Sequence, residues 1–113
     1  MEMSVRAVDR GATLIVLRGR LDREAANIVE HRFNDLAASQ KSLIVDLSGV
    51  SYIASMGMRM FLLIGKALAA EGGKMALMAP TPDVAGVLKT AGINTAIPVH
   101  ATLDDALAIF ARP

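Results

Sequence analysis

The segment from residue 43 to residue 70 constrains the fold of this chain most strongly. It begins with LIVDL (43–47), five residues that are mostly apolar and include the β-branched pair Ile-Val. They are too few for a helix and predict a buried strand. The next residues, SGVSYIAS (48–55), include a glycine and several small side chains and predict a loop. The remainder, GMRMFLLIGKALAA, predicts a helix over 57–71. A buried strand therefore leads through a loop to a helix N-terminus, whose unpaired N–H groups favour an anion or a phosphorylated hydroxyl.

Two strands and a helix are predicted ahead of this segment. Met3–Val8 and Ala12–Leu17 predict the strands, and the turn sequence DRG between them is short enough to make an antiparallel hairpin. Gly19 is expected to end the second strand. Asp22 is expected to be the N-cap of a helix that runs to about Ala38.

Two further strands, each followed by a helix, are predicted after the central segment. Lys74–Ala79 and Thr95–Val99 predict the strands. Thr81, followed by a proline, predicts the N-cap of the first helix, whose buried stripe is predicted at Val84, Val87, Leu88 and Ala91. Thr102 with Asp105 resembles a capping box and opens the last helix.

The predicted order of elements is ββαβαβαβα, which indicates a single α/β domain over residues 1–113. The hairpin makes the first two strands antiparallel. The later strands alternate with helices, so we expect them to be parallel and joined by right-handed crossovers. The fold class is therefore a mixed sheet with an N-terminal antiparallel hairpin, packed by four helices.

The composition excludes several classes of protein. The chain has no cysteine, which excludes disulfides and thiolate chemistry. Its net charge is +1 and no tract of like charges occurs, so neither nucleic acid nor an anionic membrane surface is an expected partner. No apolar run approaches the roughly 20 residues that span a bilayer, and the charged N-terminus lacks the apolar segment of a signal peptide. We therefore expect a cytoplasmic protein without direct membrane insertion.

No pattern in the chain indicates catalysis. A Walker loop, a dinucleotide fingerprint and a catalytic triad are all missing from the sequence. His31 and His100 lack ligand-type spacing to an acid or to another histidine. Asp46 is either a ligand or catalytic acid or, as we favour, a residue that fixes the turn by accepting hydrogen bonds from nearby backbone N–H groups. We therefore expect no metal, no cofactor and no enzymatic activity.

The predicted central helix carries apolar residues on its outward side. On a helical wheel Met56, Leu62 and Leu63 lie within roughly 60° of Arg59. The opposite side, expected to face the sheet, holds Met60, Phe61, Ile64 and Leu68. Outward apolar residues indicate a surface for a partner protein, or else a surface that another helix of the same domain covers. Ser55, just before this helix, is either only an N-cap or a modifiable hydroxyl beside that surface.

Three parts of the sequence together resemble the STAS domain, the fold of the bacterial anti-sigma factor antagonists. LRGRLDREAA resembles the Gly-x-Leu-Asp segment that enters the first helix of that family. LIVDLSGVSYIASMG resembles its central signature, a strand ending in Asp-Leu-Ser followed by Asp-Ser-Ser-Gly or Asp-Ser-Thr-Gly. GGKMALMAPTPDVAGVLKTAGI resembles its next strand, Pro-containing turn and helix. The resemblance covers almost the whole chain.

This resemblance implies a regulatory binding module. Antagonists of this family hold an anti-sigma factor, which is a protein kinase, and so free a sigma factor for transcription. The kinase phosphorylates a Ser or Thr at the start of the second helix, and a phosphatase reverses the reaction. The partner-binding residues implied here are Ser51, Tyr52, Ala54, Ser55, Met56, Gly57, Met58, Arg59, Leu62 and Leu63.

The chain departs from the family pattern at the phosphorylation motif, which reads Ala-Ser-Met-Gly at 54–57. When the motifs are aligned by Gly57, the usual acceptor is Met56, and Ser55 keeps a hydroxyl one residue early. Ser55 is then a displaced acceptor, or the switch is lost. We favour loss, because in-line transfer requires a closely placed hydroxyl and one residue turns a helical side chain by about 100°.

Two alternative functions remain open from the sequence. One is a cytoplasmic STAS subunit of a membrane complex that transports a lipid or an anion, since such subunits resemble the antagonists in sequence. The other is a sensor of a nucleotide or small anion, bound at the helix N-terminus over 55–57 with Arg59.

Overall fold

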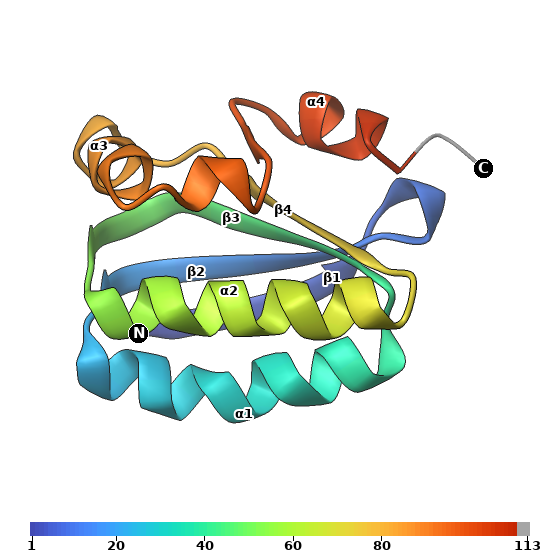
Figure 1. Cartoon of the computed structure of the whole chain (residues 1–113), viewed down its shortest axis with the longest axis horizontal. Helices are drawn as coiled ribbons and strands as arrows, with labels where there is room; N and C mark the ends of the chain where they lie inside the picture. The colour runs from blue at the N-terminus through green and yellow to red at the C-terminus, as the bar shows by residue number, and fades with distance from the viewer. Residues whose placement is uncertain (111–113) are drawn as a thin grey trace.

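The computed structural model describes residues 1–110, which form a five-stranded sheet packed by helices (Figure 1). The strands are β1 (Glu2–Ala7), β2 (Thr13–Leu21), β3 (Ser42–Ile53), β4 (Lys74–Met78) and β5 (Val99–His100). The α-helices are α1 (Arg23–Ser39), α2 (Ser55–Ala70), α3 (Pro82–Thr90) and α4 (Leu103–Ala108). Short 3-10 turns at Asp9–Gly11 and Ile93–Thr95 complete the described elements.

The strands follow one another across the sheet in chain order, β1-β2-β3-β4-β5. β1 is antiparallel to β2, and every later pair is parallel. The predicted order ββαβαβαβα and the mixed sheet are therefore confirmed. Figure 1 shows α1 and α2 side by side on one side of the sheet and α4 on the other, with α3 near the end of β3.

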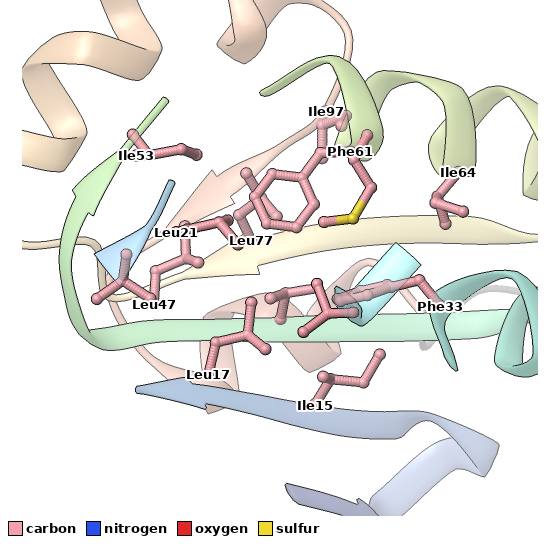
Figure 2. Close-up of a cluster of buried hydrophobic side chains, with 14 of the residues drawn as sticks. Ile15, Leu17, Leu21, Phe33, Leu47, Ile53, Phe61, Ile64, Leu77 and Ile97 are labelled. Carbon is pink, nitrogen blue, oxygen red and sulfur yellow. The ribbon is translucent and has the colours of Figure 1, made fainter. Parts of the chain in front are cut away.

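The core lies on both faces of the sheet because β3 alternates its side chains. Leu43, Val45 and Leu47 are fully buried in the larger cluster, which the helices α1, α2 and α3 complete (Figure 2). Ile44 points to the opposite face and joins a smaller cluster with Ala106 of α4. Residues 43–45 of β3 are therefore buried on both faces, as expected for a strand covered on both sides, whereas Asp46 is half-buried and Ser48 is exposed.

The two long helices meet through an aromatic pair. Phe33 of α1 and Phe61 of α2 are both fully buried, with ring centroids 5.9 Å apart and ring planes at 71°. This edge-to-face arrangement adds about 0.5–1.5 kcal/mol to the free energy of burying the rings. As expected from the helical wheel, Met60, Phe61, Ile64 and Leu68 are the large buried residues of α2.

The helix boundaries agree with several predicted caps. The Asp22 carboxylate accepts a hydrogen bond from the Ala25 N–H at 2.9 Å. The hydroxyls of Thr81 and Thr102 accept from backbone N–H groups three residues later, at 3.3 and 3.1 Å. These three N-caps are confirmed, and α1 extends to Ser39, one residue beyond the predicted end. Within residues 1–110, no helix is both long and apolar enough to cross a bilayer.

The predicted loop over 48–55 is wrong, because β3 continues to Ile53 and is 12 residues long. β2 likewise passes Gly19 and reaches Leu21, which pairs with Ile53. The two strands remain paired through register shifts between Val16 and Arg18 and between Gly19 and Arg20. These irregularities break the two-residue alternation of buried positions, so the sequence pattern alone does not indicate a strand.

Two predictions in the C-terminal third are also wrong. The predicted strand Thr95–Val99 is instead a 3-10 turn followed by the two-residue β5, because the Ala96 and Ile97 N–H groups both bond back to the Ile93 carbonyl. Val87 and Ala91 are exposed, whereas Val84 and Leu88 are buried as predicted. α3 therefore buries a narrower stripe than its apolar pattern predicts.

Removing the ring of Phe61 should destabilise the fold. Phe61→Ala is expected to lower the free energy of unfolding by about 3–5 kcal/mol, because it leaves a cavity against Phe33. Chemical denaturation measures the loss. Leu63→Ala on the same helix is the control, since Leu63 is 48% exposed and its truncation should change stability by under ~1 kcal/mol. Equal losses in the two variants would contradict this assignment of the core.

Candidate functional site

The start of α2 lies where β2 and β3 end together. The Ala54 N–H donates to the Leu21 carbonyl at 2.9 Å, which joins the last residue of β2 to the residue after β3. α2 then begins at Ser55. The helix N-terminus is therefore held at the carboxyl ends of parallel strands, the usual place for binding sites in α/β sheets.

Ser55 is not the N-cap of α2, so the first of the two interpretations of Ser55 from the sequence is wrong. The N-cap is Ala54, whose backbone is extended (φ −88°, ψ 165°) and whose side chain makes no capping hydrogen bond. Ser55 is the first helical residue and is exposed to solvent. The helix begins two residues earlier than predicted, because β3 runs directly into it without an intervening loop. The Ser55 hydroxyl is thus free of the structural role that its position suggested.

Gly57 allows α2 to approach the sheet closely. It is buried, and a Cβ atom built on it would lie 3.0 Å from two side-chain atoms of Leu21 and 3.2 Å from Ile53. Leu21 and Ile53 lie at the same end of the core in Figure 2 and are themselves buried. A larger residue at 57 would push the first turn of α2 away from the strands.

The outward face of α2 carries an apolar surface that α1 leaves open. Met56 is 36% exposed and Leu63 is 48% exposed. Both, with Arg59, line a hollow of only about 40 Å³ shared with Ala26, Asn27 and Glu30 of α1. α1 therefore lies beside these side chains without covering them. Leu62 differs from the prediction, because it is half-buried and packs on the core.

A second hollow, of about 560 Å³, separates the start of α2 from α3. Its lining residues are Met58, Pro82, Asp83, Gly86, Val87, Thr90 and Ala91. The sequence does not indicate that α3 contributes to this hollow, because the apolar pattern of α3 predicts a buried Val87. In the structure Val87 is 41% exposed. Asp83 is the one ionisable lining residue, so this hollow suits an apolar or cationic group better than a phosphate.

Tyr52, near the end of β3, is a further exposed side chain close in sequence to the start of α2. Its ring is 42% exposed, and the Arg20 guanidinium carbon lies 4.4 Å from the ring centroid in a cation–π contact. Arg20 and Tyr52 are register partners in the β2–β3 ladder. The sequence alone did not predict this pair, because its members are far apart in the chain and only the strand register brings them together.

Asp46 accepts a hydrogen bond from the Ser48 N–H at 2.9 Å. This bond lies inside β3, next to the first register shift, and not in a loop as predicted. Asp46 therefore stabilises the irregular part of the strand. No group of three or more His, Cys, Asp or Glu side chains among residues 1–110 is arranged to hold a metal ion.

Gly57→Ala should destabilise the fold by about 1–3 kcal/mol, because the new methyl group overpacks the contact with Leu21 and Ile53. Gly86→Ala is the matched control. Gly86 lies within α3, and a Cβ added there would have no neighbouring atom within 4 Å, so this change should raise stability by about 0.5–1 kcal/mol. Thermal and chemical denaturation measure both changes. A gain of stability in Gly57→Ala would contradict the close approach described here.

Comparison with known proteins agrees with the overall fold. The family model of the STAS domain matches residues 4–106. The chain is 28% identical to BtrV of Bordetella bronchiseptica, whose name assigns it to the anti-sigma factor antagonists, over 97% of this chain and 95% of that protein.

Solved structures of named antagonists have the same fold. An anti-sigma factor antagonist from Mycobacterium paratuberculosis has a TM-score of 0.88 and 26% identity, covering 98% of this chain and 94% of that one. SpoIIAA of Bacillus, in its unphosphorylated form, has a TM-score of 0.79 and 23% identity, covering 96% and 95% of the two chains. The chain therefore belongs to the STAS domain family.

Proposed function

We propose that this chain is a regulatory binding module of the anti-sigma factor antagonist type, which binds an anti-sigma factor or a related kinase-like protein. The observation that carries the proposal is the exposure of Met56 and Leu63 beside the first turn of α2. Large apolar side chains on the open face of a helix favour a protein contact, and methionine adapts to the shape of a partner. The names of BtrV and of the mycobacterial relative support this class of partner.

The proposed contact surface extends to both sides of α2. Met56 and Leu63 supply its apolar centre, and Met58 with Val87 forms the hollow toward α3. Tyr52, held under Arg20, lies on the β3 side. Tyrosine and arginine are enriched among the residues that dominate binding energy at interfaces, and a ring already held by a cation loses little freedom on binding.

We further propose that this chain binds without a phosphorylation switch. The resemblance to the family motif places the usual hydroxyl acceptor at Met56, whose side chain cannot accept phosphate. Ser55 is exposed but precedes that position by one residue, a rotation of about 100° around the helix. A phosphate would add a charge of about −1.5 to −2 to the apolar surface and would disrupt an apolar contact there. Without a phosphorylation site, the surface stays able to bind its partner at all times.

A charge at the centre of the proposed surface should weaken binding. Leu63→Glu is expected to weaken the complex by about tenfold or more, because it places a carboxylate in an apolar contact. The immobilised chain is used to capture partners from its native lysate, and mass spectrometry identifies a kinase-fold protein. Ala70→Glu, at the exposed end of the same helix, is the control and should leave capture unchanged. Absence of any kinase-fold protein, or equal capture by Leu63→Glu, would refute the proposal.

The lost switch is tested by intact-mass analysis after incubation with ATP and the captured kinase. The wild-type chain is expected to gain no phosphate. Met56→Ser is expected to gain one, because it returns a hydroxyl to the second helical position. A phosphate on the wild-type chain that is missing from Ser55→Ala would show that Ser55 is the acceptor and that the switch persists.

A further inference from the structure

β1 is the outermost strand of the sheet, and its outer edge has no partner strand among residues 1–110. Edge strands present unpaired N–H and C=O groups that can pair with another chain, and proteins commonly protect them with very short strands, prolines, bulges or charged side chains. The six residues of β1, EMSVRA, contain no proline, pair with β2 in an unbroken register and carry one charge of each sign. This edge is therefore open to strand addition.

The sequence of β1 is complementary to itself in the antiparallel direction. If a twofold axis passes through Ser4, Glu2 stands opposite Arg6 of a second copy, and Met3 stands opposite its Val5. The even-numbered residues share one face of the strand, so the two symmetry-related Glu–Arg pairs lie on the exposed face. Directly opposed charges of opposite sign and apolar pairs both stabilise an antiparallel ladder.

Apolar side chains next to this edge are left partly uncovered. Met3 and Val5 pack against the large core cluster but are only half-buried, on the face that carries α1 and α2. Ile28 of α1 is 65% exposed and Met1 is 41% exposed. Both line one hollow of about 420 Å³, with Arg20, Asp22, Glu24 and Ala25. The uncovered apolar residues therefore lie on the same side of the molecule as the open strand edge.

We propose that β1 pairs with β1 of a second copy of this chain, forming a symmetric dimer in which two five-stranded sheets are joined into one. The charge complementarity of Glu2 and Arg6 specifies the antiparallel register. The second copy completes the burial of Met3 and Val5 and covers Met1 and Ile28. The contact involves a short strand, so the dimer is in equilibrium with the monomer. Arg20 lines the hollow around Met1 and Ile28 and also belongs to the proposed partner surface, whereas Met56 and Leu63 are not part of the dimer contact.

The experiment is sedimentation velocity over a concentration series, with no tag on the N-terminus. The wild-type chain is expected to dimerise with increasing concentration. Arg6→Glu and Glu2→Arg each place like charges opposite one another across the twofold axis, and each alone should weaken dimerisation by about tenfold or more. An equimolar mixture of the two variants opposes Glu to Arg at both positions and should dimerise again. A monomer at every concentration, or a mixture no tighter than its components, would overturn the proposal.

Further variants separate dimerisation from folding and from partner binding. Glu2 is also the register partner of Arg18 within the chain, so circular dichroism must confirm that each variant is folded. Ile28→Glu changes an exposed residue and should also weaken the dimer, which provides a second test if Glu2→Arg does not fold. Val87→Glu on α3 is the control and should dimerise as the wild type does. If Ile28→Glu and Arg6→Glu both dimerise normally, the β1 interface is refuted, whatever the result for the α2 surface.

Discussion

The close contact of Gly57 with Leu21 and Ile53 is the constraint on which the candidate site depends. It holds the first turn of α2 against the side chains at the ends of two parallel strands, because Gly57 contributes no side chain of its own to the contact. With that turn in place, the Phe61 side chain lies in the core against Phe33, and the Leu63 side chain is exposed to solvent. One helix therefore forms a wall of the core and also carries the proposed binding surface, because its two faces have different neighbours.

The proposed partner surface is built from elements that are far apart in the chain. β2 contributes Arg20, β3 contributes Tyr52, α2 contributes Met56 and Leu63, and α3 contributes Val87. All of them are carried by regular elements whose other faces are buried, so the surface is formed before a partner arrives. Such preorganisation reduces the entropy lost on binding. The proposed loss of the phosphorylation switch, with Met56 at the usual acceptor position, would keep this surface apolar under all conditions.

The sequence predicted the order of the elements, the hairpin and three helix caps, because these depend on short-range patterns and on single side chains such as Asp22 and Thr81. It also predicted which residues of α2 face the sheet. It failed where strand pairing overrides local pattern. Residues 48–53 form part of β3 only because β2 continues beside them through two register shifts. Because β3 runs directly into α2, Ser55 is the first helical residue and not the N-cap.

By itself, then, the sequence determined the fold class, the family resemblance and the apolar character of α2, since each follows from residue types and their spacing along the chain. Only the tertiary structure decided that α1 leaves Met56 and Leu63 uncovered, that Val87 faces a hollow, and that Arg20 lies over Tyr52. The reason is that exposure and pairing depend on how whole elements are placed against one another. That placement is set by strand register and by the close approach at Gly57, neither of which has a periodic signal in the sequence.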